Sequence, residues 1–263
     1  MRYVYDALRM NLRSAAQYGK SFLMQCLAQL VMTAGDLWAV LLLLERFGNM
    51  GHWEAGQILF FFGVMQITFA FTEIINRGLG RFSDVMIRNG GFDTVLLRPR
   101  SPLKQVILSQ TDPRRVGSML VGIAAVAIAS VNLGLRWTFG KMLLLLWSMA
   151  GTVCLLMGLF LIEAVVCFFS VQSIEVVNVL TYGGRQACQY PIDLYPGPIR
   201  ILFTCVVPIA LCLHVPVSLV LGRPIFAVPE WLVWVLPCAG LAFFALIAFL
   251  WRFGVRHYRS TGS

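Results

Sequence analysis

Charged residues are scarce in this sequence. Of its 263 residues, 12 are acidic and 21 are lysine or arginine, which makes a charged fraction of only 13%. A soluble domain carries about 25% charged residues. Here 59% of the residues are hydrophobic and the mean hydropathy is +0.77. The composition therefore argues against a soluble domain and predicts an all-α membrane protein with several spans.

Motifs for nucleotide, metal and nucleophilic chemistry are also missing. The sequence contains no GxxxxGK[ST] phosphate loop, no HExxH motif and no GxSxG motif. Its seven cysteines form no CxxC pair, and its three histidines are widely separated. We therefore expect a chain that is not an enzyme, with no catalytic residue, bound cofactor or metal of its own.

Six apolar blocks are long enough to cross a bilayer, which requires about 20 residues. They cover residues 21–44, 56–76, 116–135, 142–169, 199–221 and 230–251. The third block is rich in small residues, which predicts a helix inside the bundle. Pro208 and Pro216 predict a break or kink in the fifth. Residues 170–198 are weakly hydrophobic and are interpreted as an amphipathic continuation and an irregular loop. Together the blocks predict one transmembrane domain over residues 1–263.

Apolar and basic residues alternate along residues 1–20 with helical spacing. This pattern predicts an amphipathic helix that lies on the membrane surface. A plain basic extension of the first span is the alternative interpretation. No apolar core followed by a small-residue cleavage site occurs here, so the pattern does not indicate a signal peptide.

Basic residues concentrate in residues 77–115, a segment that we call the polar island. It holds eight of the 21 lysines and arginines. With six spans, the side of the termini and island carries 17 basic residues and the other side carries four. The positive-inside rule then predicts that the island and both termini are cytoplasmic. Because the basic residues flank apolar blocks, we expect no binding to nucleic acid.

Polar residues inside the first two spans are candidates for a functional role. Gln25, Gln29 and Asp36 fall along one stripe of the first span, and a carboxylate in a span should face protein or water. We interpret them as residues of a substrate path or a dimer interface, with a simple interhelical hydrogen bond as the alternative. Glu73 precedes Arg77 by one turn, which predicts an ion pair within the second span.

Two stretches carry a resemblance to a known family. Residues 90–103 read GGFDTVLLRPRSPL. This run resembles a signature of the small bacterial ABC-2 family permeases. The Tyr190-Pro191 and Tyr195-Pro196 pairs, followed by two proline-containing runs, are similar to the C-terminal half of that family. The six spans, the basic N-terminal helix and the long loop after the second span fit the same resemblance, which covers essentially the whole chain.

The resemblance implies the permease subunit of an ATP-binding-cassette exporter in the bacterial inner membrane. Such a subunit pairs with a second copy or a sister permease, and separate ATPase subunits bind the ATP and magnesium. The loop after the second span is expected to be the cytoplasmic coupling region that contacts those ATPases. The residues expected to make this contact are Phe92, Asp93, Leu96, Leu97, Arg98, Pro99 and Arg100.

Three alternatives remain open at this stage. Arg98 and Arg100 would contact lipid headgroups instead of an ATPase if residues 90–103 only cap the bundle. The whole chain could be a stand-alone channel or ion-coupled carrier, in which case transport would depend on Asp36 or Glu163. It could also be a membrane scaffold that transports nothing.

Overall fold

The computed structural model describes Met10 and residues 19–47, 51–169, 175–225 and 228–258. Every element in this described part is a helix. Most of the amphipathic helix predicted over residues 1–20 lies outside the described residues, so that prediction stays a prediction. The all-α fold expected from the composition is confirmed.

Five helices are long and apolar enough to cross a membrane. They are α2 (Gly19–Phe47), α3 (Ala55–Gly80), α6 (Val116–Asn132), α7 (Phe139–Val166) and α13 (Cys238–His257), and the short α12 (Glu230–Val235) precedes the last of these. These helices overlap the predicted blocks at residues 21–44, 56–76, 116–135, 142–169 and 230–251. The predicted block at residues 199–221 is a bent pair of shorter helices instead.

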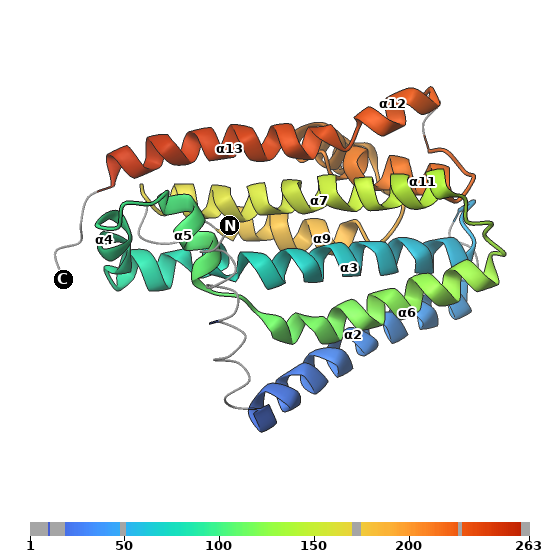
Figure 1. Ribbon diagram of the computed structural model, residues 1–263. Coiled ribbons are helices and arrows are strands. Elements are labelled where there is room, and N and C mark those ends of the chain that lie inside the picture. The colour runs from blue at the N-terminus through green and yellow to red at the C-terminus, as the bar shows by residue number, and fades with distance from the viewer. Residues whose placement is uncertain (1–9, 11–18, 48–50, 170–174, 226–227, 259–263) are drawn as a thin grey trace.

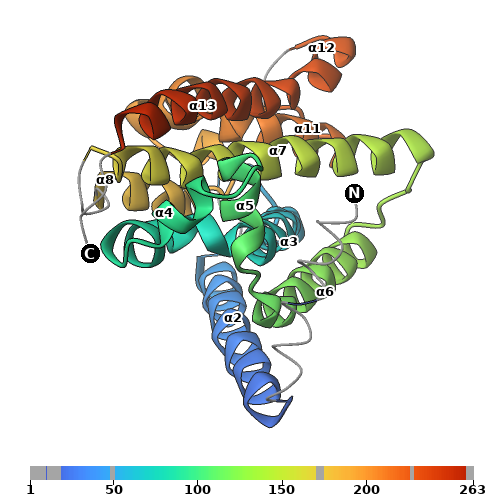
Figure 2. The same cartoon turned by 60° about the vertical axis from the view of Figure 1, so that its left-hand side comes forward.

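Helix α3 lies at the centre of the bundle. It separates α2 and α6 on one side from α7 and α13 on the other (Figures 1 and 2). Of its most apolar stretch, 78% is buried, against 33% for α6. The expectation that the small-residue third span lies inside the bundle is therefore wrong. Its small residues instead allow α6 to press closely against α3.

The close approach of α3 and α6 occurs at Gly63 and Gly122. A Cβ atom on Gly63 would lie 2.8 Å from the Gly122 carbonyl oxygen, and one on Gly122 would lie 2.9 Å from that of Gly63. Both distances are shorter than real Cβ contacts, so only glycine fits at this crossing. Gly151 of α7 and Gly240 of α13 make a similar contact on the other side of the bundle.

The polar island folds into four short helices at one end of the bundle, which we call the island end. They are a π-helical turn η1 (Phe82–Arg88), α4 (Gly91–Leu96), α5 (Pro102–Ser109) and a 3₁₀ turn η2 (Pro113–Arg115). Pro102 occupies the first turn of α5, where its missing N–H is tolerated.

An aromatic cluster fixes these short helices to the bundle. Phe92 of α4 lies 5.4 Å from Phe82, 5.3 Å from Phe168 and 6.1 Å from Trp251, measured between ring centroids. The rings belong to η1, the end of α7 and α13, and Phe92 is fully buried. Edge-to-face pairs of this kind stabilise packing beyond the area that they bury. The island is therefore a rigid part of the fold.

Residues 175–193 cross the bundle, although the sequence suggested only an amphipathic continuation and a loop. They contain α8 (Glu175–Asn178), η3 (Val179–Gly183), α9 (Gly184–Ala187) and η4 (Ile192–Leu194). Tyr182 contacts Phe69 of α3 with 5.8 Å between ring centroids, and Asp193 accepts a hydrogen bond of 3.0 Å from the indole of Trp53, just before α3. The chain thus runs along α3 from its middle to the end opposite the island.

The predicted fifth span is a bent pair whose two ends lie at the same end of the bundle. Residues 197–206 (α10, Gly197–Ile201, and η5, Leu202–Val206) meet residues 210–220 (η6, Ala210–His214, and α11, Val215–Val220) at 84° around Pro208. Arg200 donates to the Asp193 carbonyl oxygen at 2.8 Å, and Arg223 pairs with Glu54 at 2.7 Å. Both contacts lie opposite the island, so the bent pair enters and leaves there.

Six segments still cross the bundle in the described part of the chain: α2, α3, α6, α7, residues 175–193 and α13. The sequence-based count placed Arg185 and Arg200 on the side of the island. The structure corrects both positions, because Arg185 lies inside the bundle and Arg200 lies at the opposite end.

Candidate functional site

The island end presents an exposed elbow between α4 and α5, which we define as residues 96–101. Its base is rigid, because Phe92 and Val95 are buried and the side-chain amide of Gln105 donates to the Val95 and Arg100 carbonyl oxygens at 3.2 and 3.1 Å. Its tip is open: Leu97 is 86% exposed. A fixed base and an open apolar tip are features of a surface that docks a partner.

The structure divides the predicted coupling residues into two groups. Phe92 is an anchor in the aromatic cluster, and the half-buried Asp93 interacts with Tyr258 at the end of α13. The remaining residues lie on the exposed elbow: Leu96, Leu97, Arg98, Pro99 and Arg100. Only this second group is in position to touch another molecule.

A second feature is a pocket of about 300 Å³ at the island end, between α2 and η2. We call it the arginine pocket. Its lining residues are Gln25, Ala28, Gln29, Met32, Arg77, Asp112, Arg114 and Arg115. Two of the predicted path residues, Gln25 and Gln29, thus lie in one pocket with three guanidinium groups, which carry donors suited to a carboxylate or phosphate.

Asp112 organises the arginines of this pocket. Arg114 binds it through two hydrogen bonds of 2.5 and 2.7 Å, and Arg77 lies 3.6 Å away. Burial acts to raise the pKa of the Asp112 carboxyl, but the hydrogen bonds and positive charge of Arg114, with the charge of Arg77, hold that pKa below its ordinary value. Asp112 therefore stays ionised at neutral pH. Arg114 also donates to Gln25 at 2.9 Å, which ties η2 to α2.

The predicted ion pair between Glu73 and Arg77 is wrong. Glu73 pairs instead with Arg115 at 2.8 Å, and Arg77 turns to Asp112. Arg115 lies in η2 and Asp112 directly precedes it, so these pairs join α3 to the segment that leads into α6. An exposed pair within one helix would contribute only a few tenths of a kcal/mol, whereas Glu73 is buried and its pair joins two elements.

A polar cluster inside the bundle continues from the arginine pocket. Arg185 of α9 donates to Gln66 of α3 at 3.1 Å and pairs with Asp36 of α2 at 3.5 Å, while its guanidinium lies 5.0 Å from the centre of the Phe69 ring. Glu73 interacts electrostatically with Arg185 as well as with Arg115. The cluster and the pocket therefore form one charged network between α2 and α3.

The structure shows why Asp36 is tolerated in a span. It faces another protein group, Arg185, as the sequence requires, yet its side chain is still 44% exposed. Sequence reasoning missed Arg185, because the segment around it is too short and too polar to resemble a span. An unpaired acid in the first span was the available signal, since such an acid needs a cation nearby.

The arrangement binds and orients charged groups, and nothing in it suggests bond-breaking chemistry. The described residues hold no group of three or more metal-ligating side chains. Most members of the charged network already pair with each other, leaving one excess positive charge among Asp36, Glu73, Asp112 and four arginines. Such a lining suits the passage or brief holding of a molecule with an anionic part.

Comparisons with known proteins agree with the geometry. A family model described as ABC-2 family transporter protein matches residues 30–262. Searches of curated proteins and of solved structures each returned no match. The family match covers α2 from residue 30 onward, the other five crossing segments, the island, and the acids and arginines of the charged network. The chain therefore belongs to the ABC-2 family of transporter proteins and is a multi-pass permease subunit of an ATP-binding-cassette transporter, a class that works with a separate ATPase subunit.

Proposed function

We propose that this chain is the permease of a bacterial inner-membrane exporter, that it works as a dimer, and that its partner ATPases dock on the α4–α5 elbow. The observation that carries the proposal is the elbow itself: an exposed leucine and two exposed arginines on a base fixed by buried aromatic rings. In this proposal the ATP and magnesium are bound by the ATPases, and this chain holds no cofactor.

The orientation follows from the distribution of charge. With the corrected positions of Arg185 and Arg200, fifteen lysines and arginines fall on the side of the island and termini and five on the other. The positive-inside rule then puts the island in the cytoplasm, where ATPases reside. The correction of the fifth crossing leaves this orientation unchanged.

The exposed surface of α2 supports a dimer. Only 11% of its most apolar stretch is buried, and it projects from the bundle beside α6 (Figure 2). Gln25 and Asp36 lie on this helix with much of their surface uncovered. Because exposing a carboxylate to lipid is unfavourable, a second permease or a water-filled path should cover this side. We propose that the path passes Gln25, Gln29 and Asp36.

Movement of the elbow would reach the path through short connections. The elbow leads into α5, and α5 packs on α3 beneath Gly78, where a Cβ would collide with the Val106 carbonyl oxygen. From there the chain reaches Asp112, whose pairs hold α3 and η2 together and, through Arg114, contact α2. Closure of the ATPases could thus shift α3 relative to α2.

The proposal is tested by charge reversal on the elbow. Arg98→Glu with Arg100→Glu should insert normally but lose ATPase stimulation when the complex is reconstituted in proteoliposomes. Arg136→Glu with Lys141→Glu, at the opposite end, changes the same number of charges and should keep the stimulation. Full stimulation in the elbow variant would remove the elbow from the mechanism.

The same proteoliposomes separate the exporter from an ion-coupled carrier. An exporter requires ATP and its ATPase, and its transport stops when ATP is withheld. Transport driven by an ion gradient without ATP, and abolished by Asp36→Asn or Glu163→Gln, would instead establish the carrier.

A further inference from the structure

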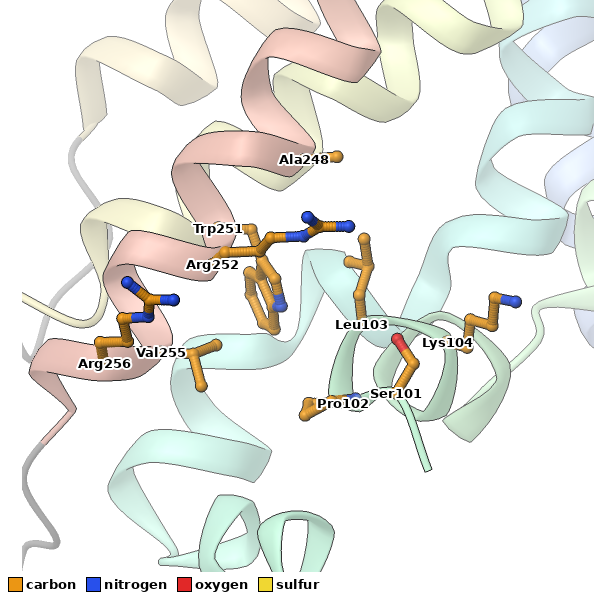
Figure 3. Close-up of a pocket in the computed structure, with 9 residues that line it drawn as sticks. All are labelled: Ser101, Pro102, Leu103, Lys104, Ala248, Trp251, Arg252, Val255 and Arg256. Carbon is orange, nitrogen blue, oxygen red and sulfur yellow. The ribbon is translucent and has the colours of Figure 1, made fainter. Parts of the chain in front are cut away.

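A groove of about 500 Å³ lies at the island end between the start of α5 and the end of α13 (Figure 3). It is separate from the arginine pocket and from the exposed tip of the elbow. Its lining residues are Ser101, Pro102, Leu103, Lys104, Ala248, Trp251, Arg252, Val255 and Arg256. Of these residues, Trp251 belongs to the aromatic cluster and none belongs to the charged network.

The groove joins an apolar floor to a basic rim. Leu103, Trp251 and Val255 form the floor, and Arg252 extends over it toward Leu103 (Figure 3). Lys104 and Arg256 add two more exposed cations. None of the nine lining residues is acidic, whereas the arginine pocket holds its own counter-ion in Asp112. The groove therefore presents three positive charges for a ligand to neutralise.

The apolar floor continues along the membrane-spanning part of α13. Leu241, Ala245, Ala248 and Arg252 are spaced by four, three and four residues along α13. These spacings place all four on one face of the helix. Leu241 and Ala245 are exposed, so this apolar face of α13, which we call the track, is uncovered above the groove. A ligand with an anionic head in the groove could lay a hydrocarbon chain along this track.

We propose that the groove is a binding site for an anionic phospholipid of the leaflet at the island end. The phosphate would contact Arg252, Arg256 and Lys104, and an acyl chain would lie against Ala248 and the track above it. The charge complementarity and the continuity of the groove with the spanning surface of α13 both favour a lipid over a soluble anion. Bound there, the lipid would bridge α5 and α13 without occupying the elbow tip.

Trp251 lies in the floor of the groove, so quenching of its fluorescence reports a lipid bound there. The protein is placed, with and without its ATPase, in phosphatidylcholine nanodiscs that contain a small fraction of dibrominated phosphatidylglycerol or dibrominated phosphatidylcholine. The contribution of Trp251 is obtained by subtracting the fluorescence of the Trp251→Phe variant from that of the natural protein. Each basic residue near an anionic headgroup strengthens association by about fivefold. Quenching by brominated phosphatidylglycerol should therefore saturate at a much lower fraction of brominated lipid in the bilayer than quenching by brominated phosphatidylcholine.

Variants then test which residues cause the preference for phosphatidylglycerol over phosphatidylcholine. Arg252→Gln should weaken it by about fivefold, and the triple Lys104→Gln, Arg252→Gln, Arg256→Gln should make the two lipids equal. Ala248→Leu, which narrows the floor without changing charge, should reduce quenching by both lipids. The control Lys20→Gln, Arg81→Gln, Arg88→Gln removes three exposed charges from the same end and should keep the full preference.

Three results would overturn the site. They are equal quenching by both lipids in the natural protein, a loss of preference in the control as large as in the groove triple, and a preference that disappears when the ATPase is bound. The last result would show that the groove belongs to the ATPase interface.

Discussion

Single ion pairs decide how the island is attached to the bundle. Glu73 and Asp112 each hold an arginine of the 3₁₀ turn η2, and both carboxylates are buried. A buried charge is costly when it loses its partner, so these pairs fix position more than they add net stability. Two predictions follow from that asymmetry.

Removing either Glu73 or Arg115 alone should destabilise the fold more than removing both charges together. Arg115→Gln leaves the Glu73 carboxylate without its closest cation and should destabilise the fold by about 3–5 kcal/mol. Adding Glu73→Gln to that variant should recover most of the loss. Thermal unfolding of the two single variants and the double variant in nanodiscs measures this coupling. Strictly additive losses would show that the two groups do not interact.

The pairing of Asp112 should also depend on pH. The pKa of this carboxyl is lower in the folded protein than its ordinary value of about 4, so its stabilising contribution is full above that value. The contribution is lost as the pH falls through the lower, folded pKa. The difference in melting temperature between the natural protein and Asp112→Asn should therefore be constant from pH 8 to pH 5 and shrink below about pH 4. A difference that instead grows on acidification would contradict the assignment.

Helix packing in the bundle depends on points where two backbones nearly touch. Gly63 and Gly122 allow α3 and α6 to cross without any side chain between them. Gly63→Ala should therefore destabilise the protein by about 1–3 kcal/mol, through overpacking. Gly140→Ala is the control, because a Cβ there meets nothing within 4 Å. Urea or thermal unfolding of both variants compares them directly, and equal stability would rule out the tight crossing.

The bent pair makes a topological prediction at the same scale. Its two ends lie together, so Gly197→Cys and Pro224→Cys should both react with an impermeant maleimide added outside intact cells. Ser101→Cys, at the island end, should react only after the membrane is opened. Labelling of just one of the first two cysteines from outside would restore the single span at residues 199–221.

Hydropathy identified the long helices because each contains an apolar stretch of about the length that crosses a bilayer. It failed for residues 175–193, since Asn178, Thr181 and Arg185 lower the mean. Thr181 is buried, and Arg185 contacts Gln66 and Asp36 inside the bundle. Conversely, residues 199–221 are apolar enough to span but bend at Pro208. Hydropathy reports the cost of transfer into lipid, so it cannot distinguish a crossing segment from a bent pair.

Site residues were predictable only in part for a related reason. Helical spacing singled out Gln25 and Gln29, and the family resemblance singled out residues 92–100. Partners distant in sequence decide the roles of both groups. Phe92 is an anchor because four other rings surround it, whereas the nearby leucines and arginines are exposed. Glu73 exchanged its expected partner for Arg115 once η2 packed against α3.

At the scale of the whole molecule, a central helix, α3, has a charged network on one side and the short helices of the island packed at one end. The two are joined through α5, η2 and the Asp112 pairs. This arrangement agrees with the proposed permease, in which the substrate path lies beside α2 and the ATPases act on the island. The proposed coupling of ATP hydrolysis to transport depends on an ATPase contacting the elbow.

Cross-linking from the elbow tip measures that contact most directly. Leu97→Cys should form a cross-link to the partner ATPase in membranes that contain both proteins, and the yield should change when ATP is added. Arg136→Cys, exposed at the opposite end, should form none. An elbow cysteine that never reaches the ATPase, in a complex that still hydrolyses ATP in response to the permease, would contradict the account.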